Sequence, residues 1–127
     1  MEKAEIQALI REAFAAQKFA YVPYSHFHVG AALRGKNGQV FRGCNIENAS
    51  YTPTNCAERT ALFKAVSEGV REFDAIAIVG SKVGETNTLV TGPCGVCRQA
   101  LYEFGGPELT VIMARSEADY IVTTLGD

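Results

Sequence analysis

The chain has 127 residues, of which 47% are hydrophobic and 20% are charged, and this predicts a single globular domain over residues 1–127. Twelve Lys and Arg against fourteen Asp and Glu give a net charge of -2, and no basic stripe follows from the sequence, which argues against nucleic acid as a substrate. The sequence carries neither a signal-peptide pattern nor an apolar run long enough to span a membrane, so we expect a cytoplasmic protein with no membrane partner.

The first half of the chain is predicted to form a helix, a β-hairpin and a second helix. Helical spacing of apolar residues indicates the first helix, and alternation of apolar residues indicates the first strand. The Gly-Lys-Asn-Gly sequence at 35–38 supplies the hairpin turn, and Gly69 is the expected end of the second helix. The expected ranges are a helix over 2–19, strands over 27–33 and 39–45, a loop over 46–55 and a helix over 56–68.

The second half is predicted to contain three strands and one helix. The unbroken apolar run at 75–79 indicates a strand that is buried on both faces, as in a parallel sheet covered by helices. The remaining elements are expected at 84–88 (a surface loop), 95–104 (a helix), 109–113 and 120–124 (two strands). This order predicts an α/β fold, a three-layer α-β-α sandwich around a mixed, mostly parallel five-stranded sheet.

Three cysteines and one glutamate stand in two short segments, Cys56-Ala57-Glu58 and Pro93-Cys94-Gly95-Val96-Cys97. Three protein ligands leave the fourth position of a catalytic zinc ion open for water. Glu58, which is not counted among the ligands, is then available to move the protons of that water. The sequence therefore predicts a catalytic zinc site.

The predicted fold explains how ligands so far apart in the sequence could share one metal ion. If the strands before the two helices run parallel, right-handed crossovers place both helix N-termini at the carboxyl end of the sheet. Cys56 and the Cys94/Cys97 pair would then meet there. The partial positive charge of helix N-termini favours the thiolate form, which is the form that binds zinc.

Other interpretations of these cysteines remain open at this point. A Cys-x-x-Cys pair also occurs in redox proteins, although Cys56 and Glu58 would then have no role. A structural zinc site would need a fourth protein ligand, for which Cys44, His26 and His28 are the candidates. Cys44 is more simply explained as a buried small thiol, and His28 as an ordinary strand histidine.

The combination of motifs resembles a known family. Cys-Ala-Glu followed by Pro-Cys-x-x-Cys is the zinc deaminase signature, and segments 24–33, 43–51 and 56–60 look like the small homotetrameric zinc-dependent cytidine deaminases. The resemblance extends from the first helix to about Thr124. It implies a cytidine deaminase-like fold, one Zn²⁺ per subunit as the cofactor, and a homotetramer as the assembly.

The resemblance also implies roles for individual residues. Cys56, Cys94 and Cys97 would be the zinc ligands, and Glu58 would transfer protons while water adds to carbon 4 of the cytosine ring. Arg59, three residues after Cys56, can donate to a ligand sulfur and so offset the charge of three thiolates, although an ordinary surface arginine would fit the same spacing.

The substrate contacts are expected at Phe27, Asn45 and Glu47. Asn45 and Glu47 point to one side of a strand and suit the paired hydroxyls of a ribose, and Phe27 can stack on a pyrimidine, although core packing would also explain it. A carboxylate at the sugar repels phosphate, so we expect cytidine and 2'-deoxycytidine to be deaminated to uridine and 2'-deoxyuridine in pyrimidine salvage. A related nucleoside or a nucleoside antibiotic is the alternative substrate.

Two expectations concern the subunit interface. Tyr24 and Tyr51 look like family positions near the interface, although core packing would also explain them. The family usually continues after the last strand with a Leu-Leu-Pro segment and an aromatic residue that reaches a neighbouring active site, and this sequence ends at Asp127 before such a segment. We expect that difference to affect substrate affinity more than zinc binding.

Overall fold

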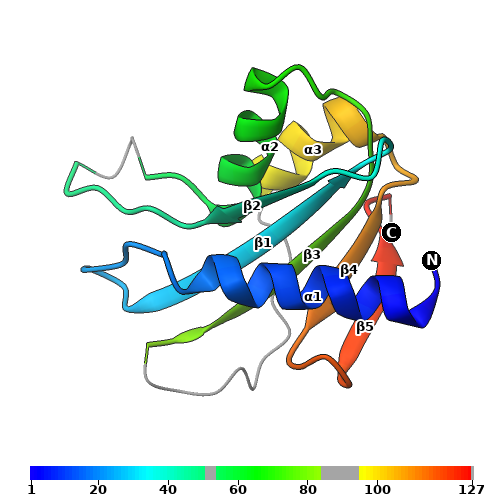
Figure 1. Cartoon of the computed structure of the whole chain (residues 1–127). Helices are drawn as coiled ribbons and strands as arrows, with labels where there is room; N and C mark the ends of the chain where they lie inside the picture. Colours follow the sequence, from blue (N-terminus) through cyan, green and yellow to red (C-terminus); the bar gives the residue numbers. More distant parts are fainter. Residues whose placement is uncertain (51–53, 84–94, 127) are drawn as a thin grey trace.

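The computed structural model describes residues 1–50, 54–83 and 95–126, and it consists of one sheet between two layers of helix (Figure 1). The elements in chain order are α1 (Lys3–Gln17), β1 (Phe27–Gly35), β2 (Val40–Cys44), α2 (Ala57–Ser67), β3 (Phe73–Lys82), α3 (Gly95–Gly105), β4 (Thr110–Ala114) and β5 (Tyr120–Thr124). None of the helices within these ranges combines the length and the apolar composition that crossing a bilayer requires. Every predicted helix and strand is present, with bounds that differ from the expected ones by a few residues.

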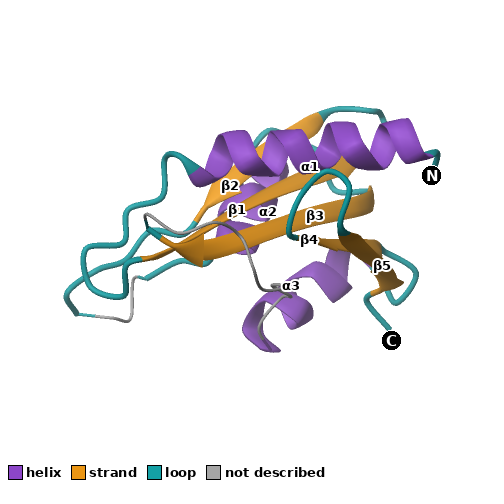
Figure 2. Cartoon of the chain, turned by 90° about the horizontal axis from the view of Figure 1, so that it is seen from below, coloured by secondary structure: helices purple, strands orange, loops and turns teal. Residues whose placement is uncertain are grey.

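The helices cover both faces of the sheet. Figure 2 shows α1 on one side and α2 and α3 on the other, with the five strands between them. Each face has its own cluster of buried apolar side chains, which for α1 includes Ile10 and for α2 includes Leu62, both fully buried. Burying one such side chain contributes about 1.5–3 kcal/mol to stability. The predicted three-layer α-β-α sandwich is confirmed.

The strand order in the sheet is β2-β1-β3-β4-β5. Strand β1 pairs antiparallel with β2 and with β3, and β4 pairs antiparallel with β5. Only β3 and β4 pair in parallel among the described strands. The mixed five-stranded sheet is confirmed, but the prediction that it is mostly parallel is wrong, because short connections join β1 to β2 and β4 to β5, and such turns force antiparallel pairing.

The strands that precede α2 and α3 nevertheless point in the same direction. Strands β2 and β3 both run antiparallel to β1, which lies between them, and they are therefore parallel to each other without being neighbours. Helix α2 follows β2 and α3 follows β3. The N-termini of both helices consequently lie at the same end of the sheet, as the sequence predicted.

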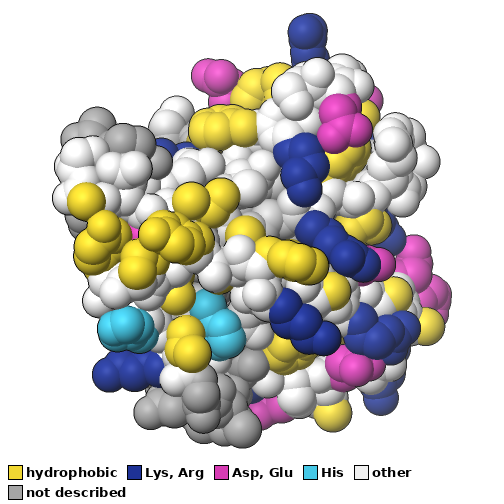
Figure 3. Space-filling view, turned by 60° about the vertical axis from the view of Figure 1, so that its left-hand side comes forward, with side chains coloured by type: hydrophobic (Ala, Val, Ile, Leu, Met, Phe, Trp, Pro, Cys, Tyr) yellow, Lys and Arg dark blue, Asp and Glu magenta, His cyan; other side chains and the backbone are white. Residues whose placement is uncertain are grey.

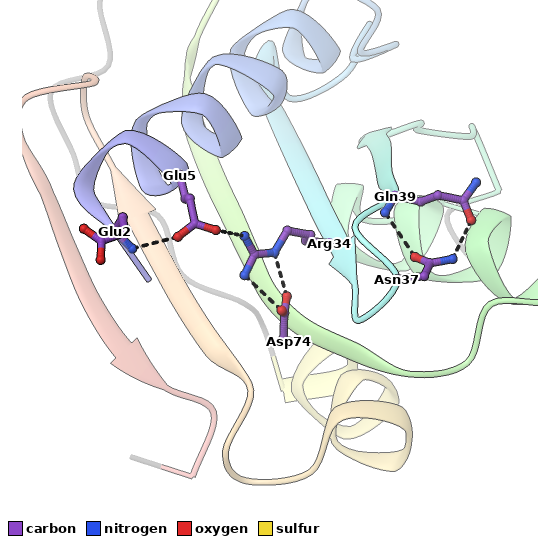
Figure 4. Close-up of polar contacts among 6 residues, drawn as sticks. All are labelled: Glu2, Glu5, Arg34, Asn37, Gln39 and Asp74. Atoms are coloured by element: carbon purple, nitrogen blue, oxygen red, sulfur yellow. Dashed lines mark hydrogen bonds and ion pairs between the residues drawn. The ribbon is translucent and has the colours of Figure 1, made fainter.

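Local sequence signals fix the ends of these elements. Gly38 has φ 91° in the β1–β2 turn, where its N–H donates to the carbonyl of Gly35 at 2.9 Å, and Gly69 has φ 91° just after α2. Both values lie in the left-handed region that glycine adopts without strain. The Asn37 side chain accepts from the N–H of Gln39 at 3.0 Å and stiffens the same turn (Figure 4).

An arginine joins α1 to the sheet at the end opposite to the α2 and α3 N-termini. The Arg34 guanidinium donates to both carboxylate oxygens of Asp74, at 2.8 and 2.9 Å, and to Glu5 at 3.0 Å (Figure 4). Glu5 in turn accepts from the backbone N–H of Glu2 at 2.9 Å. This network ties the first turn of α1 to β1 and β3.

Candidate active site and metal centre

The first turn of α2 carries three of the predicted site residues. Cys56 is the N-cap residue, with extended backbone at φ -76° and ψ 156°, and Glu58 and Arg59 follow within the turn. The carbonyl of Cys56 accepts from the N–H and the hydroxyl of Thr60, at 3.0 and 3.1 Å. The Asn55 amide donates to the same hydroxyl at 3.1 Å. These bonds fix the backbone of Cys56 at the start of the helix.

Cys56 and Cys97 face the same two side chains although they belong to different helices. Arg59 Nη2 donates to Cys56 Sγ at 3.5 Å, and the Arg59 guanidinium also makes a hydrogen-bonding contact with Cys97. The Glu58 carboxyl makes a hydrogen-bonding contact with Cys97 and lies close enough to Cys56 to be affected by its charge. The structure therefore brings four predicted site residues together, with Cys97 fully buried.

This group of side chains fits a zinc ion. Sulfur is a preferred zinc donor, and a guanidinium directed at ligand sulfur is an outer contact that orients such ligands and compensates their charge. The hydrogen bond to Cys56 is also the main reason why the pKa of Arg59 is raised. Cys94, the third predicted ligand, lies outside the described residues.

The pKa of the Glu58 carboxyl is shifted strongly by its surroundings. Glu58 is only 4% exposed, and burial raises its pKa to about 7, with a smaller contribution in the same direction from the charge of Cys56. A carboxyl group with a pKa near neutrality can both accept and release a proton under physiological conditions. A bound zinc ion would favour the carboxylate form through its positive charge.

The alternative fourth ligands lie elsewhere. Cys44 lines a separate cavity with Ala16 and Phe19, and His28 contacts Ser81 through Nε2 at 2.9 Å. His26 lies in a turn with φ 58°, where its carbonyl accepts from Val83. Among the residues that the structure describes, no group of three His, Cys, Asp or Glu side chains is arranged to hold a metal ion, so neither histidine nor Cys44 completes a set with Cys56 and Cys97.

Asn45 and Phe27, two of the expected substrate contacts, touch each other. Asn45 Oδ1 accepts from the N–H of Val29 at 2.9 Å, and its Nδ2 donates to the carbonyl of Phe27 at 2.9 Å. The amide therefore continues the β1–β2 pairing by one step and keeps one donor and one acceptor site for a ligand. Phe27 itself is half-buried.

Glu47 lines a cavity of about 420 Å³ together with Tyr24, Ser25, Asn48 and Thr54, whereas Phe27 and Asn45 are not among its lining residues. Glu47 Oε1 accepts from the backbone N–H groups of Tyr24 and Ser25, at 3.0 and 3.1 Å. The hydrogen bond from the Ser25 side chain is the largest of several contributions that lower the pKa of Glu47. The carboxylate thus holds the turn before β1 as well as facing the cavity.

Apolar side chains are exposed at the end of the molecule that carries the Glu47 cavity. Tyr21, Tyr24 and Ile46 are each about half exposed, at 56%, 59% and 43%. Figure 3 brings this end forward and shows hydrophobic side chains gathered near both histidines. Tyr24 is therefore not a core residue of the single chain, while Tyr51 lies outside the described residues.

Asn55 and Thr60 contribute to the site in a way that the sequence did not predict. Asn55 also exchanges two backbone hydrogen bonds with Ile46, at 2.8 and 2.9 Å, and so fixes the entry to α2 against the segment that carries Asn45 and Glu47. A threonine four residues after a possible N-cap was the available signal, because its hydroxyl can reach the N-cap carbonyl. The partner at position 55 could not be identified without the fold.

The chain is similar in sequence and fold to known cytidine deaminases. Residues 3–113 match the family model of the cytidine and deoxycytidylate deaminase zinc-binding region. The cytidine deaminase of Halalkalibacterium halodurans is 51% identical over 121 residues, which cover 95% of this chain and 88% of that protein. The cytidine deaminase of Sporosarcina psychrophila is 47% identical over 121 residues, covering 95% and 85%. The crystal structure of a cytidine deaminase from Burkholderia pseudomallei is similar, with a TM-score of 0.84, 52% identity and coverage of 94% and 92%.

Proposed function

The chain belongs to the cytidine and deoxycytidylate deaminase family, and on this premise we propose that it hydrolyses cytidine and 2'-deoxycytidine to uridine and 2'-deoxyuridine with release of ammonia. The observation that carries the proposal is the buried Glu58 carboxyl in contact with Cys97 and close to Cys56. Such a carboxyl beside a pair of thiols suits water activation next to a metal ion.

Zn²⁺ is the cofactor of the family, whose model describes a zinc-binding region, and Cys56, Cys94 and Cys97 would hold one ion per subunit. When bound, zinc supplies a Lewis acid that lowers the pKa of a water molecule toward neutrality. The hydrogen bonds from Arg59 to Cys56 and Cys97 would reduce the negative charge on the sulfur atoms. A zinc ion held by these ligands would then be a stronger Lewis acid than one held by three thiolates without such hydrogen bonds.

Glu58 would carry the protons of the reaction. It accepts one proton from the water that adds to carbon 4 of the cytosine ring and passes it to ring nitrogen 3. A second transfer delivers a proton to the amino group, which leaves as ammonia while the carbonyl of the uracil ring forms. Burial of Glu58 opposes its charged form and so favours uptake of a proton, whereas the positive charge of a bound zinc ion would favour its release, so both halves of this role are supported.

The substrate selectivity would come from Glu47, Asn45 and Phe27. Glu47 faces the 420 Å³ cavity, and its negative charge opposes a phosphate near the sugar. Asn45 retains a donor and an acceptor beside Phe27. We therefore expect a free pyrimidine nucleoside as the substrate and a catalytic efficiency on cytidine monophosphate that is lower by about tenfold or more.

The proposed assembly is a homotetramer of single-domain subunits in the cytoplasm. The exposed Tyr21, Tyr24 and Ile46 supply apolar surface of the kind that subunit contacts bury. Cysteine ligands suit a reducing compartment, where thiols stay free to bind metal. Light scattering that finds a stable monomer would contradict the assembly without touching the chemistry.

The deciding experiment follows the loss of ultraviolet absorbance as cytidine becomes uridine, together with the zinc content of the protein. We expect turnover at one zinc per chain, loss of turnover with a strong chelator and recovery when Zn²⁺ is restored. Parallel assays with a cytosine-containing nucleoside antibiotic separate the alternative substrate. Stoichiometric zinc without turnover of cytidine would contradict the proposed reaction.

A further inference from the structure

Helix α2 lies unusually close to strand β2 at one position, Gly43. A Cβ atom at Gly43 would lie 2.3 Å from the carbonyl oxygen of Ala57 and 2.5 Å from the backbone nitrogen of Ala61. It would also lie 2.9 Å from the Ala61 Cβ. Distances below about 3 Å between such atoms are forbidden by van der Waals repulsion. Only glycine therefore permits the observed spacing.

The atoms that exclude a side chain here belong mainly to the helix backbone. A flexible side chain could rotate away, but the Ala57 carbonyl and the Ala61 N–H are fixed by the helix itself. Ala57 and Ala61 are both fully buried, and their small side chains allow the same close approach from the helix side. Gly43 consequently sets the height of the first two turns of α2 above the sheet.

The same two turns carry the zinc-site residues. Ala57 stands between Cys56 and Glu58 in the sequence, and Arg59 follows. Cys97 belongs to α3, which follows β3, and the three atoms nearest to a Cβ at Gly43 all belong to α2 and not to α3. A shift of α2 away from β2 would therefore move Cys56, Glu58 and Arg59 relative to Cys97, while zinc tolerates ligand distances only within about 0.2 Å.

We propose that Gly43 is a positioning residue for the zinc site: by letting α2 seat directly on β2, it fixes the distance between the Cys56 sulfur and the Cys97 sulfur. The inference rests on the proposed zinc function of these cysteines. Gly43 has no side chain and would contact neither the metal nor the substrate, yet in this proposal it controls the geometry at which the metal is held.

The other face of the sheet offers a matched control. Gly30 on β1 is packed against α1 in the same manner, with a Cβ that would lie 2.0 Å from the Ala13 carbonyl oxygen and 2.6 Å from the Gln17 nitrogen. Helix α1 carries none of the proposed site residues. Alanine at Gly30 and alanine at Gly43 thus add the same atom against the same kind of helix backbone on opposite faces.

The experiment compares Gly43→Ala with Gly30→Ala by thermal unfolding, by competition with a zinc chelator and by the absorption spectrum of the Co²⁺-substituted protein. Overpacking lowers the melting temperature of both variants by several degrees. Only Gly43→Ala is expected to lower zinc affinity, by about 10- to 100-fold, and to shift the sulfur-to-cobalt bands. Wild-type zinc affinity and an unchanged cobalt spectrum in Gly43→Ala would overturn the proposal, as would an equal loss in Gly30→Ala.

A milder variant covers the case in which Gly43→Ala does not fold. Ala61→Ser adds one atom to the helix side of the same contact, and its hydroxyl can bond to the carbonyl four residues earlier. We expect a folded protein with zinc affinity reduced about threefold to tenfold, in the same direction as Gly43→Ala. An unchanged affinity in Ala61→Ser would count against the proposal.

The zinc measurements use no nucleoside, so they distinguish the role of Gly43 from the proposed reaction. Wild-type protein that binds zinc but leaves cytidine intact would contradict the proposed reaction alone. Wild-type protein that binds no zinc would overturn both the reaction and the role of Gly43.

Discussion

The two faces of the sheet are built alike but serve different purposes. On each face a helix seats on a strand glycine, Gly30 under α1 and Gly43 under α2, and covers a cluster of apolar side chains. Among the described residues, the α1 face buries two uncharged polar side chains, Ser81 and Gln17, and the Gln17 amide donates to the His28 carbonyl at 3.1 Å. The α2 face buries Glu58, whose pKa is raised to about 7.

This difference shows how the molecule separates stability from chemistry. Burying an ionisable group is unfavourable unless its environment compensates the charge. On the α2 face the buried ionisable group is Glu58, which the proposed reaction needs, whereas Gln17 and Ser81, the buried polar side chains described on the α1 face, carry no charge. Changes on the α2 face should therefore affect metal binding and turnover, and changes on the α1 face should affect only the free energy of unfolding.

The largest expected effect comes from Glu58→Gln. The amide keeps the size of the side chain but cannot accept and return a proton, so we expect kcat to fall by about two to four orders of magnitude, with zinc content unchanged. Absorbance assays on protein of measured zinc content test this. Gln17→Glu is the matched change on the α1 face and should lower stability while leaving turnover per folded molecule intact. Wild-type turnover by zinc-loaded Glu58→Gln would remove Glu58 from the mechanism.

The next largest effects are expected from substitutions that create a cavity under either helix. Leu62→Ala and Ile10→Ala each delete a fully buried side chain and should lower the free energy of unfolding by about 2–5 kcal/mol in urea titrations. Leu62 lies one turn below Glu58, so Leu62→Ala should also lower kcat. Ile10→Ala should leave kcat per folded molecule unchanged, and a similar loss of kcat in both variants would contradict the separation of the two faces.

Two arginines give a third and smaller contrast. Arg59→Ala removes the donor to Cys56 and should lower zinc affinity or activity by about 10- to 100-fold. Arg34→Ala removes the fork to Asp74 and Glu5, whose side chains are 38% and 49% exposed, so we expect a loss of only about 1 kcal/mol in stability. If Arg59→Ala leaves zinc affinity, activity and the pH profile unchanged, its contact with the sulfur atoms has no functional role.

The smallest effect concerns Glu5 and pH. The backbone hydrogen bond from Glu2 and then the hydrogen bond from Arg34 lower the pKa of Glu5 below 4.5. The folded state therefore binds this proton less tightly than the unfolded state, and the resulting stability is present above the ordinary pKa and lost as pH falls through the folded pKa. Melting curves of wild type and Glu5→Gln should converge as pH falls from above the ordinary pKa of a glutamate through the lowered folded-state pKa of Glu5. A gap that stays constant over this range would contradict the interpretation.

Sequence periodicity predicted the elements well because each one has a clear local signal. Val40 to Cys44 alternates, a left-handed Gly69 follows the end of α2, and β3 contains the unbroken apolar run at 75–79. The meeting of Cys56 and Cys97 was also predictable, since it requires only that β2 and β3 point the same way. The position of β1 between them was not predictable, because a hairpin can add to either edge of a strand pair with equally good hydrogen bonding.

The roles of polar side chains around the cavity were harder to predict. Asn45 and Glu47 were expected to face a sugar, and the structure gives both of them backbone partners, Phe27 and Val29 for Asn45 and the Tyr24–Ser25 turn for Glu47. Their spacing in the sequence predicted only a shared side of a strand, and in the structure both residues lie beyond the end of β2. Which backbone groups need a partner depends on where the chain turns, and residue spacing does not contain that information.

The paired backbone of Ile46 and Asn55 closes the base of the connection between β2 and α2. Glu47, Asn48 and Thr54, which line the cavity, belong to this connection, whereas Cys56 and Glu58 follow the closure. Residues within the connection can therefore be exchanged during evolution without displacing the start of α2. This arrangement allows related proteins to differ in the substrate that they bind while keeping Cys56 and Glu58 in the same place.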